Sequence, residues 1–222
     1  RHKLMFVYQV YRLKEILKKN HFDVIHVHSL KNTVSIALKQ MLNKIPFVIT
    51  DHGFWNQKDA SFKGSDTFIR IKKSIEACSN LIFISEFARK KHSEIDFGQQ
   101  DKLVKIKNPL FITDEPFLKK NNNLKKVIFF NGLTESVKIK NLPILLDAIE
   151  NDSNLKHSIK LVAIVNQEGL KYINERTYSF EIEVHGNTPW EKVIALYQMS
   201  DLLVVPSKSD SFGLVYLEAL MY

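Results

Sequence analysis

The chain is poor in residues that cross-link a backbone or let it bend freely. Its 222 residues include one cysteine, Cys78, and only 7 glycines. A single cysteine excludes an internal disulfide and favours a reducing compartment. Cys78 falls on the apolar face of a predicted helix, where we expect it to pack in the core rather than react. The glycines form no glycine-rich loop of the kind that cradles phosphate.

Long apolar runs are also missing. No stretch of about 18 uncharged apolar residues occurs, so we expect no transmembrane helix. The first residues, RHKLMF, become polar too soon for a signal peptide. The chain does not begin with Met, and we therefore expect it to be part of a longer gene product. An apolar content of 45% is nevertheless enough for a packed core, in one large domain or two small ones.

Positive charge is in excess, at a formal net charge of +8. Such an excess suits nucleic acid or anionic lipid. The lysines are spread along the chain, however, and aromatic residues do not interleave with them. We expect a solvated basic surface, keep an anionic membrane as a candidate partner, and expect no nucleic acid to bind. The expected location is cytoplasmic, with the inner face of the membrane as an alternative.

The spacing of apolar residues predicts strands that alternate with helices. Strands are expected at 23–28, 46–50, 81–84, 102–106, 127–130, 161–165, 181–184 and 202–205, and helices at 4–19, 34–41, 68–78, 142–149, 167–176, 190–197 and from 213. Ser85 and Thr188 are expected to cap the helices that follow them. Alternation of this kind predicts parallel sheets with right-handed crossovers.

The alternation stops once and then restarts. The interruption lacks periodicity and carries Pro116 and a run of three asparagines, which is typical of a linker. We therefore predict an α/β protein with two Rossmann-like lobes that contain parallel sheets. The first lobe is placed at 1–112, the linker at 113–124 and the second lobe at 125–222.

The segment 200–222 combines a strand end, a polar loop and a helix start with two carboxylates. An apolar strand ends at Pro206, a polar loop follows, and a helix begins near Gly213. Asp210 in the loop and Glu218 on the helix are eight residues apart. A helix N-terminus offers amides and a positive dipole end that suit phosphate, while carboxylates accept hydrogen bonds from sugar hydroxyls. The segment therefore predicts a binding site for a nucleotide-linked sugar.

This segment resembles the acidic motif of the retaining glycosyltransferases of family 4, the glycosyl transferases group 1 enzymes with the GT-B fold. That motif reads Pro-Ser, a few residues, then Glu-Gly-Phe-Gly-Leu-x-x-x-Glu-Ala. Asp210 stands at the first Glu and Ser211 at the first Gly, and the matching residues are Phe212, Gly213, Leu214, Glu218 and Ala219. The resemblance covers nearly the whole chain but only the middle of the family's architecture, so both lobes are expected to be truncated.

In the first lobe, residues 50–53 are similar to the family's histidine motif. The resemblance implies that His52 lies in the active site and contacts the donor sugar, with Gly53 allowing a close backbone approach. Nearby, His26 is expected to be buried in the sheet and His28 to face the opposite side. We expect no metal site, because no Cys, Asp or Glu partner has ligand spacing.

In the second lobe, residues 129–133 resemble the family's Phe-Val-Gly-Arg-Leu strand end. The resemblance places Gly132 beside the donor and a lysine further along the loop, here Lys138 or Lys140, against the donor diphosphate. Leu133 occupies the position of the family's arginine. The loss of one charge-assisted phosphate contact would cost on the order of 1.5–3 kcal/mol.

The resemblance implies transfer of a sugar from a nucleotide-sugar donor to a glycan or lipid-linked acceptor, with retention of configuration. It implies that Glu218 holds the ribose hydroxyls and Asp210 the sugar hydroxyls. The amides of Phe212, Gly213 and Leu214 would face the diphosphate, so that no cofactor or metal is needed. Three alternatives stay open: an inactive remnant that at most binds nucleotide, a GT-B nucleotide-sugar epimerase, and a basic surface-binding protein without a donor site.

Overall fold

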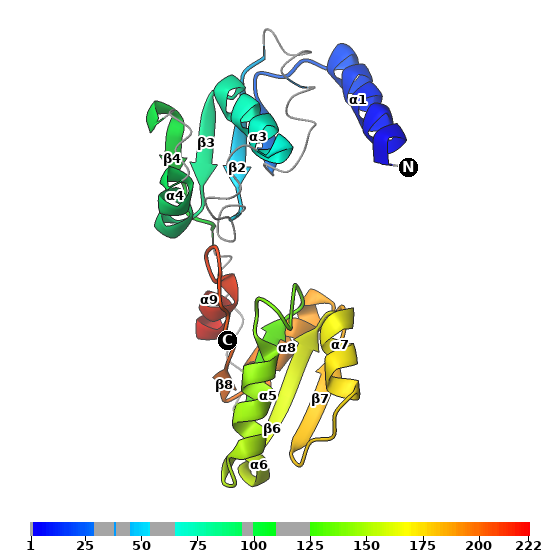
Figure 1. Cartoon of the computed structure of the whole chain (residues 1–222), viewed down its shortest axis with the longest axis vertical. Coiled ribbons are helices and arrows are strands. Elements are labelled where there is room, and N and C mark those ends of the chain that lie inside the picture. The colour runs from blue at the N-terminus through cyan, green and yellow to red at the C-terminus, as the bar shows by residue number, and fades with distance from the viewer. Residues whose placement is uncertain (1, 29–37, 39–44, 54–64, 95–99, 110–124) are drawn as a thin grey trace. The chain divides into compact units, whose positions relative to one another are not determined.

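The computed structural model describes residues 2–28, 38, 45–53, 65–94, 100–109 and 125–222 (Figure 1). The chain divides into two compact units, Arg1–Asn108 and Pro109–Tyr222. The predicted linker at 113–124 lies outside the described residues, and so does the predicted helix at 34–41 except for Leu38. The boundaries of the two lobes therefore stay a prediction.

The first unit contains a parallel sheet of four strands in the order β1-β2-β3-β4. The strands are β1 (Ile25–His28), β2 (Phe47–Asp51), β3 (Asn80–Phe83) and β4 (Leu103–Lys105). The described helices are α1 (His2–Lys19), α3 (Asp66–Ala77) and α4 (Glu86–Ser93), with a 3-10 turn at Gln100–Lys102. These bounds confirm the predicted elements of the described part to within a few residues.

Helix α3 closes the core of the first unit. Its apolar side places Ile71 and Ile75, followed by Cys78, against the strand residues Ile49 and Leu81. All five side chains are almost fully buried, which confirms that Cys78 is a core residue.

Serine side chains cap the starts of α3 and α4. The hydroxyls of Ser65 and Ser85 accept hydrogen bonds from the amides of Phe68 and Ala88, both at 3.1 Å, so the cap predicted at Ser85 is present.

The second unit is also an α/β unit with a four-stranded parallel sheet, in the order β7-β6-β5-β8. The strands are β5 (Lys126–Gly132), β6 (Ile159–Val165), β7 (Glu181–His185) and β8 (Leu202–Leu203). The helices are α5 (Leu142–Asn151), α6 (Leu155–Ser158), α7 (Gln167–Asn174), α8 (Trp190–Met199) and α9 (Leu214–Met221). Two parallel α/β units confirm the predicted fold class.

Successive side chains of β5 belong to two different cores, because a strand directs alternate residues to opposite faces. Phe130 packs with Leu146 of α5 and Ile173 of α7 on one face. Phe129 packs with Tyr197 of α8 on the other face, where Ala219 of α9 also contributes. Helices therefore cover both faces of the sheet, and β5 is central to both layers.

The predicted start of α8 is confirmed, but its predicted cap is wrong. Thr188 does not cap α8, because Pro189 occupies the cap position and no side chain caps this end. The hydroxyl of Thr188 instead donates to the carbonyl of Gly186 at 2.9 Å. Proline is compatible with a helix start because it has no amide proton to satisfy.

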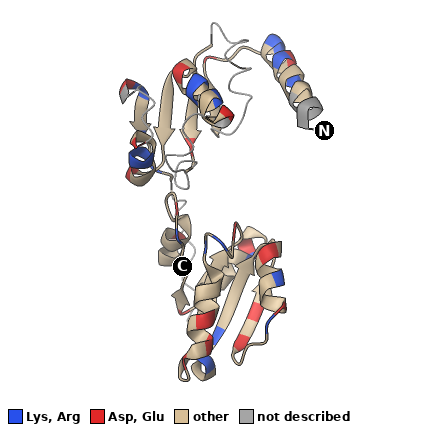
Figure 2. Cartoon of the chain, in the orientation of Figure 1, with Lys and Arg blue, Asp and Glu red and all other residues tan. Residues whose placement is uncertain are grey.

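The surface of both units carries charge of both signs. Lysine and arginine occur in each unit (Figure 2), as the spread of lysines in the sequence indicated. Among the described helices, none combines the length and the apolar character that crossing a bilayer requires.

Candidate functional site

Little space is left around Gly132, the last residue of β5. A Cβ atom on Gly132 would overlap the ring of the buried Phe130, so any larger residue here would force that ring to shift. The hydroxyl of Ser136 donates to the carbonyl of Gly132 and accepts from the amide of Asn166 at 3.0 Å. Ser136 is fully buried, so the loop that follows β5 is anchored to the sheet.

This loop presents Lys140 to the loop that follows β8. The amide of Lys208 donates to the carbonyl of Ile139 at 2.9 Å and joins the two loops. Nζ of Lys140 lies 2.6 Å from Oδ2 of Asp210, and the side chains are only 14% and 28% exposed. The ammonium group is thus placed in a sheltered position where an ion pair is strong.

Asp210 also touches the start of α9. Its Oδ1 accepts from the amide of Gly213 at 3.3 Å. Burial by itself would raise the pKa of Asp210, but the ion pair with Lys140 and the amides of Phe212 and Gly213 outweigh it, so the pKa is lowered. Asp210 is therefore an anion at neutral pH.

Gly213 makes the turn into α9 possible, since its φ of 75° lies in the left-handed region. Within the described part of the chain, the amides of Leu214 and Val215 donate to no acceptor. Two such amides at the positive end of a helix, beside the ammonium of Lys140, form a setting that attracts anions. The geometry thus brings together Lys140, Asp210 and the start of α9.

Glu218 lies further along α9 in a second polar group. Its Oε2 accepts from the hydroxyl of Tyr197 at 2.8 Å. The same hydroxyl accepts from Nδ2 of Asn131 at 3.0 Å. Sequence reasoning missed the polar roles of Tyr197 and Asn131, because Tyr197 reads as one more apolar residue in the stripe of α8. The signal available was a tyrosine in that stripe, since a buried phenol needs a partner.

The remaining predicted residues of this unit differ in exposure. Lys138 is exposed and lies 3.7 Å from Oε1 of Glu168 on α7, so it is Lys140 that the fold brings to Asp210. Leu133 is also exposed. Phe212 and Leu214 are half-buried on either side of Gly213.

In the first unit, histidines meet at the carboxyl ends of β1 and β2. Nδ1 of His28 and Nε2 of His52 are 3.0 Å apart and share a hydrogen bond. Nε2 of His26 lies 2.7 Å from Oγ1 of Thr50. The predicted burial of His26 is wrong: His26 is exposed, and its ring centroid is 4.1 Å from that of His28 on the same side of the strand. Residues two apart in a strand share a face.

The backbone at His52 is set by its neighbours. The amide of Gly53 donates to Oδ1 of the buried Asp51 at 3.1 Å, and Gly53 has a φ of 100°. Partial burial lowers the pKa of His52, and repulsion by His28 and His26 lowers it further. A neutral imidazole at pH 7 can exchange a hydrogen bond with a sugar hydroxyl. Among the described residues, no group of three or more His, Cys, Asp or Glu side chains could hold a metal ion.

The two units define a class of protein with two Rossmann-like lobes, the GT-B fold. Residues 112–222 match the family of glycosyl transferases group 1, and residues 1–110 match glycosyltransferase family 4. The chain belongs to the glycosyl transferases group 1 family. A comparison with curated proteins gave no match.

Several solved structures share the fold of this chain. The lipopolysaccharide outer core galactosyltransferase WaaB aligns with a TM-score of 0.65 and 16% identity over 100% of this chain and 60% of its own. A mutant of S. aureus TarM, in complex with fondaparinux, α-GlcNAc-glycerol and UDP, aligns with a TM-score of 0.71 and 15% identity over 96% of this chain and 42% of its own. Anabaena HepE, in complex with UDP and glucose, aligns at 0.67 and 16% over 97% and 60%. The chain thus spans 42–60% of these structures.

Proposed function

We propose that this chain forms the central part of an enzyme that moves a sugar from a nucleotide-diphosphate sugar to a glycan or lipid-linked acceptor, with retention of configuration. The observation that carries the proposal is the ion pair between Lys140 and Asp210 in front of the first turn of α9. Family membership supports the class of reaction, and the bound UDP of the TarM and HepE structures supports the class of donor.

The donor diphosphate takes the place beside Lys140. A diphosphate oxygen competes for the ammonium group of Lys140 and for the amides at the start of α9, since both favour anions. Asp210 then loses part of its ion pair, and its carboxylate becomes available to accept hydrogen bonds from hydroxyls of the donor sugar. Glu218 accepts hydrogen bonds from the ribose hydroxyls. For His52, the lowered pKa of its imidazole supports a hydrogen bond with a sugar hydroxyl. Lys140, rather than Lys138, is the principal phosphate ligand.

The reaction then depends on charge stabilisation. The bond between the anomeric carbon and the diphosphate oxygen breaks, and its electron pair leaves with the diphosphate. Lys140 and the amides of α9 stabilise the added negative charge. An acceptor hydroxyl forms the new bond on the same face of the sugar, and its proton passes to the departing diphosphate. No side-chain nucleophile, metal or cofactor takes part in these steps.

Calorimetric titration with UDP and with UMP tests the central observation. Lys140→Met is expected to weaken UDP binding about 10- to 100-fold, because a charge-assisted contact is lost and Asp210 is left as an unpaired anion. The binding of UMP, which lacks the second phosphate, is expected to be weakened much less by this variant. Lys192→Met, an exposed lysine on α8, is the matched control. ADP and GDP are titrated in parallel to identify the base.

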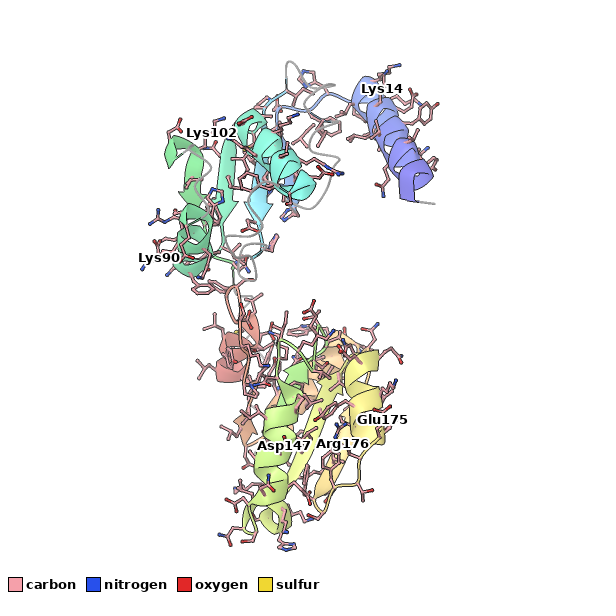
Figure 3. All side chains as sticks on the ribbon, viewed as in Figure 1. Lys14, Lys90, Lys102, Asp147, Glu175 and Arg176 are labelled. Carbon is pink, nitrogen blue, oxygen red and sulfur yellow. The ribbon has the colours of Figure 1, made fainter. Side chains whose placement is uncertain are left out.

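Product analysis tests the reaction itself. The protein is incubated with a panel of nucleotide sugars and oligosaccharide or lipid-linked acceptors, and the anomeric configuration of any product is read by NMR. Glu218→Ala is expected to abolish turnover without lowering the melting temperature by more than a few degrees. Asp147→Asn, at the exposed residue labelled on α5 in Figure 3, is expected to keep full activity. An inverted product would contradict the proposed stereochemistry.

We also propose that the enzyme works in the cytoplasm, where its basic surface contacts an anionic membrane that carries the acceptor. The net charge of +8 supports this placement, because anionic lipids attract surface lysines by about 1 kcal/mol each. Vesicles with and without phosphatidylserine provide the test by co-sedimentation in low and high salt. Equal binding to both kinds of vesicle would contradict it.

A further inference from the structure

The side chain of Tyr197 lies in the interior of the second unit. It is 4% exposed, although it carries a hydroxyl. Its ring packs edge-on against Phe129 of β5, with centroids 5.0 Å apart. A second ring, Tyr222, stacks on it at 6.1 Å. These two contacts fix the ring, so the direction of its hydroxyl bond is fixed as well.

The hydroxyl connects three elements of the unit. Nδ2 of Asn131, at the end of β5, can only donate, so the phenol oxygen accepts this bond at 3.0 Å. The one phenol proton is then directed to Oε2 of Glu218, 2.8 Å away on α9. Burial raises the pKa of Tyr197; the bond from Asn131 opposes this shift, and the carboxylate of Glu218 adds to it. The phenol therefore stays protonated and remains a donor.

We infer that Tyr197 is a positioning residue that holds one carboxylate oxygen of Glu218, so that the other faces the ribose hydroxyls of a nucleoside diphosphate. This inference rests on the proposed function. In the described part of the chain Oε1 of Glu218 accepts no hydrogen bond, whereas Oε2 accepts the bond from Tyr197. The carboxylate is thereby fixed before the ligand arrives, which lowers the entropy lost on binding.

The chain of hydrogen bonds also links the two polar groups of the site. Asn131 immediately precedes Gly132, the residue from which the loop with Lys140 begins. The same strand end therefore orients Lys140 through its loop and Glu218 through Tyr197. We expect the phosphate and ribose contacts to keep a constant spacing because both are set from β5.

The test compares UDP with 2′,3′-dideoxy-UDP, which lacks the ribose hydroxyls, by calorimetric titration. Tyr197→Phe keeps the ring and removes the hydroxyl. It is expected to weaken UDP binding about tenfold and to leave dideoxy-UDP binding unchanged. In a Glu218→Ala background, which removes the acceptor of the Tyr197 hydroxyl, the same change is expected to have less than a twofold effect. Tyr172→Phe on α7 is the control and is expected to change neither affinity.

Three other results of these titrations would contradict the positioning role of Tyr197. Equal weakening of both nucleotides by Tyr197→Phe would mean a structural role only and would overturn the inference. An undiminished effect in the Glu218→Ala background would overturn it as well. If the wild-type protein binds none of UDP, ADP and GDP, the proposed function fails and the positioning role with it. If the base is adenine or guanine, the matching dideoxy nucleotide replaces the uridine one.

Loss of the hydroxyl leaves the amide of Asn131 without its acceptor, which can destabilise the unit. The double variant Tyr197→Phe/Asn131→Leu removes both partners with side chains of similar shape. This double variant is expected to regain the wild-type melting temperature. Its preference for UDP over dideoxy-UDP is expected to stay about tenfold weaker than that of the wild type. A double variant that melts normally and keeps the full preference for UDP would overturn the inference.

Discussion

His92 is a buried basic residue whose protonation state depends on the folding of the first unit. It lies on α4 at 2% exposure, with its ring 5.0 Å from that of Phe83. Burial lowers its pKa to about 4, from an ordinary value of 6.5. The folded chain thus keeps this imidazole neutral where the unfolded chain protonates it.

Lowering the pH from 7 to 4 is therefore expected to destabilise the first unit. The unfolded state binds the additional proton between about pH 6.5 and pH 4, so the stability present above 6.5 is lost as the pH falls through this window. The loss is on the order of 2–3 kcal/mol. Denaturant titrations across this range should show a shallower pH dependence for His92→Leu. His21→Gln, at an exposed histidine, should keep the wild-type dependence, and an identical slope in all three proteins would contradict the assignment.

Cys78 is expected to react slowly in the native protein. It is buried, and burial raises its pKa to about 11 from 9.0, so the reactive thiolate is about a hundredfold rarer than at an ordinary cysteine. Ellman's reagent at pH 8 should modify it much faster in guanidinium chloride than in buffer. Fast native labelling would show that Cys78 is accessible and not only a core residue.

Single residues were also where the sequence was least informative. The position of Asp210 predicted an anion at the start of α9, and the structure has it there. Its pairing with Lys140, 70 residues away, depends on two loops that meet only in the folded unit. For His26 the prediction was wrong for a simpler reason: the two-residue period of a strand places it on the side of His28.

At the scale of elements, apolar runs predicted the strands and helical stripes predicted the helices of the described part. The differences occur where local signals are weak. The short helix α6 (Leu155–Ser158) has no buried residue, so no apolar period marks it. β8 spans only Leu202–Leu203, because the chain turns into the loop toward Asp210 soon after its pairing with β5.

The start of α9 provides a test of how one element is specified. Gly213 has a φ of 75°, and a Cβ atom there would lie 2.9 Å from Cδ2 of Tyr216. Gly213→Ala is expected to lower the free energy of unfolding by about 1–2 kcal/mol, since the left-handed conformation is costly for alanine. Gly186→Ala is the matched control, because a Cβ atom there meets nothing within 4 Å, and it should change stability by less than about 0.5 kcal/mol. Equal effects in urea titrations would contradict this account.

At the scale of the whole molecule, the alternation of strands and helices was enough to predict two parallel α/β units. The reason is physical: a buried parallel strand must be almost wholly apolar, and its return helix must be amphipathic. The sequence did not indicate which distant side chains come together within each unit. The polar link from Asn131 through Tyr197 to Glu218 joins three elements. A tyrosine in the stripe of α8 indicates that its hydroxyl needs a partner, but it does not indicate which residues supply one.

Separate cores lead to a prediction about unfolding of the whole chain. Phe83 and Ile75 belong to the core of the first unit, while Phe129 and Phe130 belong to two clusters in the second. Differential scanning calorimetry is therefore expected to resolve two transitions. Gly213→Ala should lower one of them, which assigns it to the second unit, and His92→Leu should make the other less sensitive to acid. At a UDP concentration of about 100 times its Kd, the transition of the second unit should gain about 2.7 kcal/mol while the other stays unchanged. A single transition would contradict independent unfolding, because nucleotide bound in the second unit would then stabilise the first as well. Two transitions of which both variants shift the same one would contradict it too.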